Sequence, residues 1–212
     1  MNKDQILSEM LNRYSRLAHL KEHIKKAAET IIETNKNNGK VLVCGNGGSC
    51  SDADHIVGEL MKSFEGNRPL AKSLQEKLAE LSPETGKMLA EKLQQGLPAI
   101  SLTVHQSLIT AIANDINGEV IYAQQVVGWG SSGDVLIGLS TSGNSQNVID
   151  AMIVAKAKGL TTIGITGETG GKMKEWSDIL INVPERRTAY VQELHLPVYH
   201  AICMMVEKEI FG

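Results

Sequence analysis

The segment Lys40–Ser49, KVLVCGNGGS, is the clearest indication of how this chain folds. Its first half, Lys40–Cys44, is a short apolar run rich in residues that favour β-strands, and its second half is a turn of small residues. From Ser49 to about Phe64 the apolar spacing becomes helical. The segment therefore predicts a buried strand that leads through a glycine turn into a helix.

Further strand-like runs follow, and helical segments separate most of them. Each ends in a Gly, Ser or Thr cluster or in a proline. The runs are residues 99–104 (AISLTV), 134–140 (DVLIGLS), 160–166 (LTTIGIT) and 178–183 (DILINV). Because strands that alternate with helices are typical of a parallel sheet covered on both faces, the chain is predicted to be an α/β protein.

Amphipathic helices are predicted at both ends of the chain. Residues 1–36 carry apolar side chains at spacings of three and four, which predicts one long helix over about 2–36 that packs against another helix of its own chain or of a partner. The last segment, about 188–210, is helical and apolar on one side. Pro197 lies inside it and should kink it or mark its first turn.

The segment 69–97 interrupts the alternation of strands and helices. It predicts two short amphipathic helices separated by Ser82 and Pro83, where serine caps the second helix and proline occupies its first position. This is an inserted helical hairpin. We expect it to be a subunit contact rather than a lid over a site, and both interpretations stay open.

Composition excludes several classes of protein. The 212 residues are 42% hydrophobic and 21% charged, as expected for one soluble globular domain over 1–212. A formal net charge of -3 argues against a nucleic-acid partner. Three scattered cysteines favour a reducing, cytoplasmic location over a disulfide framework. No run reaches the roughly 18 apolar residues of a membrane span, so no membrane association is expected.

Two strand-to-helix turns, Gly45–Ser49 and Ser140–Ser145, are candidates for anion binding. The first N–H groups of a helix lack intrahelical partners and carry partial positive charge, so they bind an anion without any lysine. The turns could instead be ordinary helix caps. Together at the carboxyl ends of one sheet, however, they favour a ligand.

Common nucleotide motifs do not fit these turns. The first turn departs from the dinucleotide fingerprint at Cys50, where glycine is required. The phosphate loop of nucleoside triphosphatases would need glycine at Thr166 and serine or threonine at Met173. Both classes are disfavoured.

Two predicted helices carry groups suited to proton transfer or metal binding. His55 and Glu59 are four residues apart and share a helix face. Gln192 and His200 are eight apart, about 80° around the helix axis. These residues could be a surface pair and a core histidine, a zinc-type site, or an acid–base pair for moving a hydrogen between the carbons of a sugar.

The sequence resembles the sugar isomerase (SIS) domain family, and most closely its phosphoheptose isomerases. The resemblance covers nearly the whole chain outside the hairpin and is carried by four segments in order. They are CGNGGSCSDADHIVGEL (44–60), TAIANDINGEVIYAQQV (110–126), STSGNSQNVIDAM (140–152) and VQELHLPVYH (191–200). It implies a flavodoxin-like sheet, a homotetramer formed through the terminal helices, and interconversion of sedoheptulose 7-phosphate and D-glycero-D-manno-heptose 7-phosphate through an enediolate.

The resemblance also implies roles for individual residues, with active sites that combine residues of neighbouring subunits. Glu59 and His200 are the implied acid–base pair, and one Zn²⁺ is implied on His55, Glu59, Gln192 and His200. The implied substrate-binding residues are Asn46, Gly47, Gly48, Ser49, Asp115, Ser140, Thr141, Ser142, Ser145 and Gln192.

Three positions depart from the family pattern. Ser63 aligns with a common arginine, Ala189 with a substrate-contacting aspartate, and Pro197 with an ordinary helix former. These changes leave room for another phosphorylated ketose as substrate. The alternative function is a non-catalytic SIS protein that binds a sugar phosphate or a partner protein, as do the relatives that associate with the bacterial replication initiator. Because His55, Glu59, Gln192 and His200 are all present, the sequence favours the enzyme.

Overall fold

A five-stranded parallel sheet forms the centre of the computed structural model, which covers residues 1–212. The strand order is β2-β1-β3-β4-β5, and each neighbouring pair is parallel. The strands are β1 Val41–Gly45, β2 Ala99–Ser101, β3 Val135–Ser140, β4 Thr161–Thr166 and β5 Ile179–Asn182. This is the flavodoxin-like order, so the predicted fold class is confirmed. Only β2 is clearly shorter than the predicted run.

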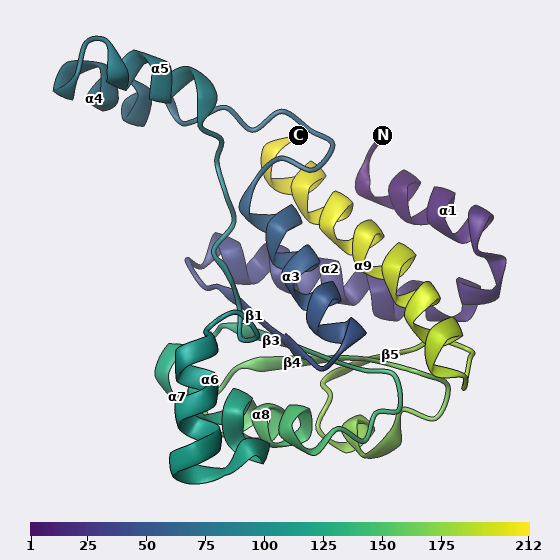
Figure 1. Cartoon of the computed structure of the whole chain (residues 1–212). Coiled ribbons are helices and arrows are strands. Elements are labelled where there is room, and N and C mark those ends of the chain that lie inside the picture. Colours follow the sequence, from purple (N-terminus) through teal and green to yellow (C-terminus); the bar gives the residue numbers. More distant parts are fainter.

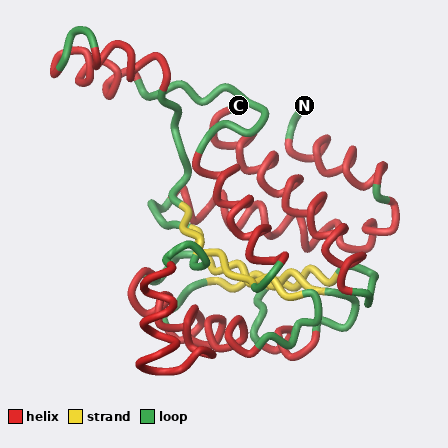
Figure 2. The backbone as a smooth tube through the Cα atoms, viewed as in Figure 1, coloured by secondary structure: helices red, strands yellow, loops and turns green.

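Helices cover both faces of this sheet (Figures 1 and 2). On one face α2, α3 and α9 pack against the strands and α1 lies on α9; on the other face lie α6, α7 and α8. The α-helices are α1 Lys3–Arg13, α2 Lys21–Lys36, α3 Gly48–Met61, α4 Lys72–Leu81, α5 Thr85–Lys92, α6 Gln106–Ile112, α7 Ile121–Trp129, α8 Gln146–Ala157 and α9 Thr188–Phe211. Short 3-10 helices span Ser15–Leu20, Gly118–Val120 and Gly171–Glu175, and a π-helix spans Ala113–Asn117.

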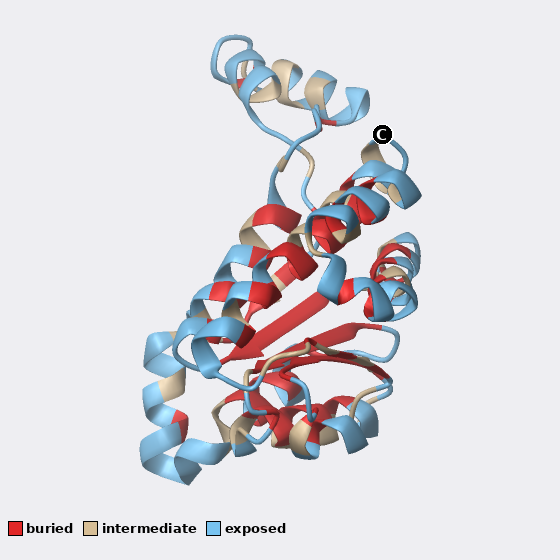
Figure 3. Cartoon of the chain, turned by 90° about the vertical axis from the view of Figure 1, so that its right-hand side faces the viewer, coloured by how far each residue is buried: buried red, intermediate tan, exposed pale blue.

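The core consists of two apolar layers, one on each side of the sheet. Successive strand residues point to opposite faces, so Val43 and Ile137 enter the layer under α3 and α9, while Leu42 and Leu136 enter the layer above α8. Figure 3 shows the buried residues concentrated along the strands and the inner helix faces. Burial on both faces explains why these strands read as continuous apolar runs rather than alternating ones.

The predicted N-terminal helix over 2–36 is wrong in one respect, because it is not continuous. The helix ends at Arg13, a 3-10 helix follows over Ser15–Leu20, and α2 begins at Lys21. Leu17 and Leu20 are both buried, and side chains three residues apart line up in a 3-10 helix. The break turns α1 back along α9 (Figure 1).

The segment 69–97 forms two helices, α4 and α5, that project away from the sheet and its helices (Figure 1). None of the residues of α4 is buried. The predicted capping by Ser82 and Pro83 is wrong, since Ser82 ends α4 and α5 begins only at Thr85. Ser82 is extended, as expected for a residue that precedes proline, and its carbonyl accepts from Gly86 N–H at 2.8 Å.

Helix α9 continues through Pro197, so this proline does not mark a first turn. Because proline has no N–H group, the carbonyl of Glu193, an exposed residue, has no partner within the helix. None of the helices is both long and apolar enough to span a membrane. All three cysteines are free, and burial raises the pKa of the Cys44 and Cys203 thiols to about 12.

His195 is fully buried in α9, and burial lowers its pKa to about 4. Between this value and the ordinary histidine pKa of about 6.5 the unfolded chain binds more protons than the folded chain, so the free energy of unfolding rises with pH there. We expect this residue alone to remove about 3 kcal/mol between pH 7 and pH 4.

His195→Gln should flatten the pH dependence of the free energy of unfolding by that amount, measured by urea denaturation at pH 7, 5.5 and 4. His19→Gln, at an exposed position, serves as the control and should keep the wild-type slope. Equal slopes in His195→Gln and wild type would contradict the assignment.

Candidate functional site

The carboxyl ends of β1 and β3 bring the two predicted anion-binding turns together. Gly45 pairs with Leu139 in the sheet, and the loops that follow meet through a reciprocal amide pair. Asn46 Nδ2 donates to Asn147 Oδ1 at 2.8 Å, and Asn147 Nδ2 donates to Asn46 Oδ1 at 2.9 Å. The two turns therefore form one continuous edge.

Tyr122 of α7 anchors this edge from below, and the sequence analysis missed it. Its hydroxyl donates to the Gly45 carbonyl at 2.6 Å and lies 3.2 Å from Asn46 Oδ1. Tyr122 is buried, and burial raises its pKa well above the ordinary value, so the hydroxyl keeps its proton. The signal in the sequence was a single tyrosine in a mostly apolar helix, and this does not indicate which backbone group the hydroxyl reaches.

The serine turn after β3 has its hydroxyl groups close to one another. Ser140 Oγ lies 2.8 Å from Ser145 Oγ and 3.5 Å from Ser142 Oγ, and Asn144 N–H donates to Ser142 Oγ at 3.2 Å. Gly143 adopts a φ of 67°, and a Cβ there would lie 2.2 Å from the Gly170 carbonyl oxygen. Only glycine fits this position, which keeps the turn tight.

Neither helix at this edge begins with a side-chain cap. Gly47, with a φ of 57°, precedes α3, and Ser145 precedes α8 without making a capping hydrogen bond. The first N–H groups of both helices therefore lack side-chain partners, which argues against the caps-only interpretation. Ser49, in the first turn of α3, is buried, and its hydroxyl makes no hydrogen bond within the chain. The edge has the groups needed to hold an anion such as a phosphate.

A second cluster lies where α3 packs against α9. His55 Nε2 is 3.0 Å from Glu59 Oε1, and the rings of His55 and His200 meet edge to face with centroids 5.0 Å apart. Lys62 Nζ donates to the other Glu59 oxygen at 3.1 Å. His200 Nε2 is buried without a hydrogen-bond partner, and burial together with nearby His55 lowers the His200 pKa.

Two residues missed by the sequence analysis, Asp52 and Tyr199, complete this cluster. The Tyr199 hydroxyl donates to Asp52 Oδ1 at 3.2 Å and lies 3.1 Å from His55 Nδ1. Burial raises the pKa of Asp52, and the hydrogen bonds from Tyr199 and Gln192 partly offset this effect. Asp52 stands three residues before His55 and so shares its helix face, but nothing local indicates a contact with Tyr199.

The structure does not place Gln192 beside His200. A Cβ on Gly48 would lie 2.2 Å from Gln192 Nε2, and that amide points to Asp52 Oδ2 at 3.4 Å. Eight residues rise about 12 Å along a helix, so the backbones of Gln192 and His200 are one above the other on α9, and only their long side chains can reach a common point. Gln192 lies between the anion-binding edge and the histidine cluster.

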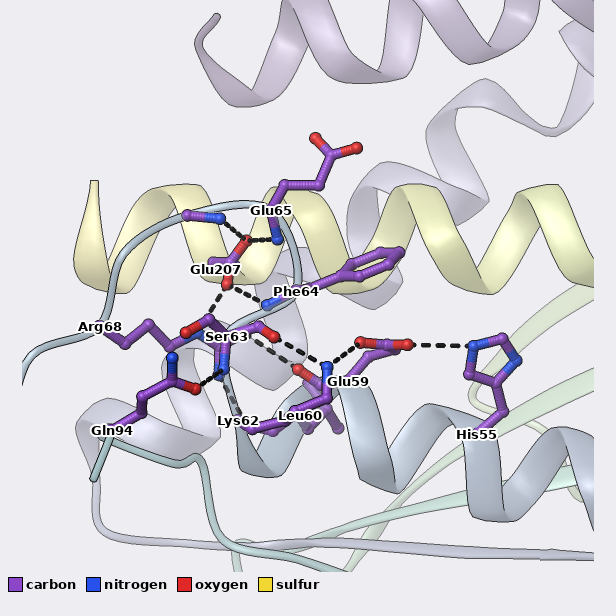
Figure 4. A network of polar contacts seen from close by, with 11 residues as sticks. His55, Glu59, Leu60, Lys62, Ser63, Phe64, Glu65, Arg68, Gln94 and Glu207 are labelled. Carbon is purple, nitrogen blue, oxygen red and sulfur yellow. Dashed lines mark hydrogen bonds and ion pairs between the residues drawn. The ribbon is translucent and has the colours of Figure 1, made fainter. Parts of the chain in front are cut away.

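A buried ion pair secures the carboxyl end of α3 (Figure 4). Arg68, which is 0% exposed, donates to Glu207 Oε1 at 2.7 Å, to the Leu60 carbonyl at 2.8 Å and to the Glu59 carbonyl at 3.0 Å. Glu207 also accepts the backbone N–H groups of residues 64–66. Burial alone would raise the Glu207 pKa, but these donors hold it below its usual value.

The loop secured by this ion pair shapes the surroundings of His200. The Phe64 ring lies 5.2 Å from the His200 ring, and Ser63 N–H donates to Gln94 Oε1 at 3.0 Å. A cavity of about 270 Å³ opens beside His200 between α1 and α9. Glu9, Arg13 and Glu65 bring charge to its walls.

The remaining predicted residues lie in different elements. Thr141 is half-buried in the serine turn, whereas Asp115 is exposed in the π-helix and accepts only from Asn114. Ala189 is exposed in the first turn of α9. Glu59 is eleven residues after Gly48 in α3, so it lies about 16 Å along the helix from the anion-binding edge. No hydrogen bond joins Glu59 to the serine turn.

The fit of a metal ion rests on donor chemistry. In this single chain no three or more His, Cys, Asp or Glu side chains converge closely enough to hold a metal. His55, Glu59 and His200 nevertheless offer two imidazoles and a carboxylate, the ligand types that zinc prefers. His200 Nε2 is buried and unpaired, and a nitrogen and an oxygen on one zinc ion lie about 3.0–3.4 Å apart, as His55 Nε2 and Glu59 Oε1 do.

Comparisons with known proteins point to one family. A model of the SIS domain matches residues 6–88 and 77–167. The phosphoheptose isomerase of Burkholderia pseudomallei is 42% identical over 189 residues, 89% of this chain and 83% of that protein. That of Aliarcobacter butzleri is 39% identical and covers 98% of both chains. The solved phosphoheptose isomerase of Neisseria gonorrhoeae is 34% identical, with a TM-score of 0.74 over 94% of each chain.

Replacing Ser142 or Ser145 by alanine should weaken binding of inorganic phosphate about tenfold each, or ~1.4 kcal/mol, because each removes a hydroxyl donor to the anion. Isothermal titration calorimetry measures the affinity. Ser107→Ala, at an exposed position in α6, is the control and should bind phosphate like the wild type. Unchanged affinity in both serine-turn variants would exclude this turn as the anion site.

Proposed function

Because the chain belongs to the SIS domain family, and within it to the phosphoheptose isomerases, we propose that it interconverts sedoheptulose 7-phosphate and D-glycero-D-manno-heptose 7-phosphate. The observation that carries this function is that α3 has an anion-binding edge at its start and, further along it, a cluster of His55 and Glu59 beside His200. An aldose–ketose isomerase needs both parts, one for the phosphate and one for the proton.

The serine turn and the start of α3 hold the phosphate in this proposal. Ser49, Ser140, Ser142 and Ser145 provide hydroxyl donors, and the turn at Gly47 and Gly48 lets backbone N–H groups approach. Asn46, Thr141 and Asp115 then contact the sugar hydroxyls. The Asn147 and Tyr122 contacts support the role of Asn46, since they orient its amide.

Glu59 carries the proton between carbons. Starting from the ketose, Glu59 takes a proton from C1, the C–H electrons form the C1=C2 bond, and the C2 oxygen gains the charge of an enediolate. His200 gives a proton to that oxygen and takes one from the C1 hydroxyl. Return of the Glu59 proton to C2 completes the aldose. The carboxylate is held in place by His55 and Lys62, one on each oxygen.

We further propose that His55, Glu59 and His200 hold one zinc ion, with Gln192 as a fourth donor after its side chain turns from Asp52. Bound zinc would act as a Lewis acid that polarises the sugar carbonyl. Two imidazoles, a carboxylate and the unpaired His200 Nε2 support this assignment.

We also propose that the protein is a homotetramer whose sites combine residues of neighbouring subunits. The separation of about 16 Å along α3 between Gly48 and Glu59 supports this arrangement, since one chain alone holds the anion far from the base. The exposed apolar side chains of the hairpin, among them Leu74 and Leu81, support a subunit contact there. The non-catalytic alternative is disfavoured, because relatives with 39–42% identity are named as isomerases.

Glu59→Gln and His200→Ala should each lower turnover of sedoheptulose 7-phosphate at least about 100-fold, because each removes a group that transfers protons. A coupled assay for aldose formation measures the rate, and circular dichroism checks the fold. The matched control is Glu22→Gln, at an exposed position of α2, which should retain wild-type turnover. Full turnover in both site variants would contradict the assigned chemistry.

Protein purified without chelator should contain about one zinc ion per chain, and His55→Ala should lose it, because the site then has too few donors. Inductively coupled plasma mass spectrometry measures the metal. His23→Ala, on the surface of α2, should keep the wild-type content. A fully active protein without metal would rule out the zinc proposal while leaving the isomerase proposal standing.

A further inference from the structure

The side chain of Asn147, in the first turn of α8, connects the two loops of the anion-binding edge. Its Nδ2 donates to Asn46 Oδ1 at 2.9 Å, and its Oδ1 accepts from Asn46 Nδ2 at 2.8 Å. The two residues are 101 positions apart in the chain. Asn147 is half-buried, whereas Asn46 is exposed in the turn that follows β1. The Asn147 amide makes no other hydrogen bond, so its one contact within the protein is with Asn46.

The backbone N–H of Asn147 is available to an anion at the serine turn. The N–H groups of Gln146 and Asn147 make no hydrogen bond within the chain, whereas Val148 N–H, the next one, already donates to the Ser145 carbonyl at 3.1 Å. Free N–H groups in the first turn of a helix are the usual donors to a bound phosphate. Asn147 therefore serves both parts of the edge, with its backbone directed to the phosphate and its side chain to Asn46.

The pair leaves Asn46 with a defined group for the sugar. An asparagine amide has two N–H donors and an oxygen that accepts twice, and the pair uses one donor and one acceptor site. Two hydrogen bonds also stop this exposed side chain from rotating freely, so its second N–H keeps a fixed direction before any ligand binds. The backbone of the turn is held separately, because the Tyr122 hydroxyl donates to the Gly45 carbonyl at 2.6 Å. Loss of the Asn147 amide should therefore release the Asn46 side chain without moving the turn.

We propose that Asn147 is a positioning residue that sets the separation between the phosphate and the sugar oxygen bound by Asn46, and thereby favours ketose phosphates of one chain length. This inference rests on the proposed function, in which the serine turn holds the phosphate and Asn46 contacts the sugar. It adds a rigid link between these two contacts. In a ketose phosphate with fewer carbons, the matching oxygen reaches Asn46 only if the pair opens or the phosphate shifts.

Equilibrium binding separates the two contacts. The probes are inorganic phosphate, ribulose 5-phosphate, fructose 6-phosphate and sedoheptulose 7-phosphate, titrated calorimetrically into protein that carries Glu59→Gln, so that no ligand is converted. Asn147→Ala keeps the backbone N–H and removes the amide. Inorganic phosphate should therefore bind within about twofold of the parent protein, whereas sedoheptulose 7-phosphate should bind about tenfold more weakly. The preference for the seven-carbon over the six-carbon ligand should fall by the same factor, because the shorter ligand gains nothing from a fixed Asn46.

A double-variant cycle tests whether Asn147 acts through Asn46. Asn46→Ala should weaken sedoheptulose 7-phosphate about 10- to 30-fold, and the double variant should bind like Asn46→Ala, because Asn147 then has no amide to hold. Gln146→Ala is the matched control. It truncates an exposed amide in the same helix turn, one that donates to Asp150, and should bind all the probes like the parent protein. Thermal melting checks that each variant folds, and Asn147→Ser answers the same question if Asn147→Ala does not.

The outcomes separate this inference from the proposed function. Equal losses for inorganic phosphate and sedoheptulose 7-phosphate, an unchanged preference for chain length, or additive losses in the double variant would overturn the role of Asn147. Unchanged affinity for every probe would do the same. Sugar phosphates that bind no more tightly than inorganic phosphate would overturn the inference together with the proposed sugar contacts. The expected affinities in a protein whose wild type converts no ketose phosphate would instead count against the isomerase assignment alone.

Discussion

The packing of α3 against α9 is the interaction on which the rest of the site depends. Contacts between the two helices step along both in the same direction, from Gly48 with Gln192, through Asp52 with Tyr199, to His55 with His200. The start of α3 also forms part of the anion-binding edge. Helix α3 therefore connects a turn at the sheet edge, where backbone N–H groups are available to an anion, to a cluster of side chains positioned by α9.

Close approach of the two helices requires glycine at the start of α3. At Gly48 a Cβ would collide with the Gln192 amide. The far end is held by polar contacts instead, since the Arg68 and Glu207 pair ties carbonyl groups of α3 and backbone N–H groups of the next loop to α9. Replacing one member of such a pair leaves an uncompensated buried charge, so the two act as a unit.

The fold was predictable from the sequence because its strands are buried on both faces. Continuous apolar runs such as residues 134–140 indicate strands without knowledge of any partner. The break in the N-terminal helix at Tyr14 was not predictable, because the apolar spacing of Leu17 and Leu20 fits an α-helix and a 3-10 helix equally well. The turn at Ser82 and Pro83 was located correctly, but its hydrogen bonds depend on Gly86.

The candidate site was predictable in part. Residues on one helix, such as His55 and Glu59, lie together as their spacing indicates, because four residues make about one turn. Angular position alone says less for Gln192 and His200, because eight residues rise about 12 Å along α9 and the Gln192 amide contacts Asp52 in this structure. Asp52 and Tyr199 meet across two helices far apart in the chain, and only the three-dimensional arrangement shows that contact.

The base of the hairpin has a consequence for how the molecule tolerates change. The chain leaves and returns through an isolated antiparallel bridge between Pro69 and Gln94, so the two ends of α4 and α5 stay adjacent whatever lies between them. Length and composition can vary beyond this clamp without straining the sheet. Gln94 also holds Ser63, one turn past Glu59. The sequence of the hairpin can therefore vary, while its base stays hydrogen-bonded to the loop that follows Glu59.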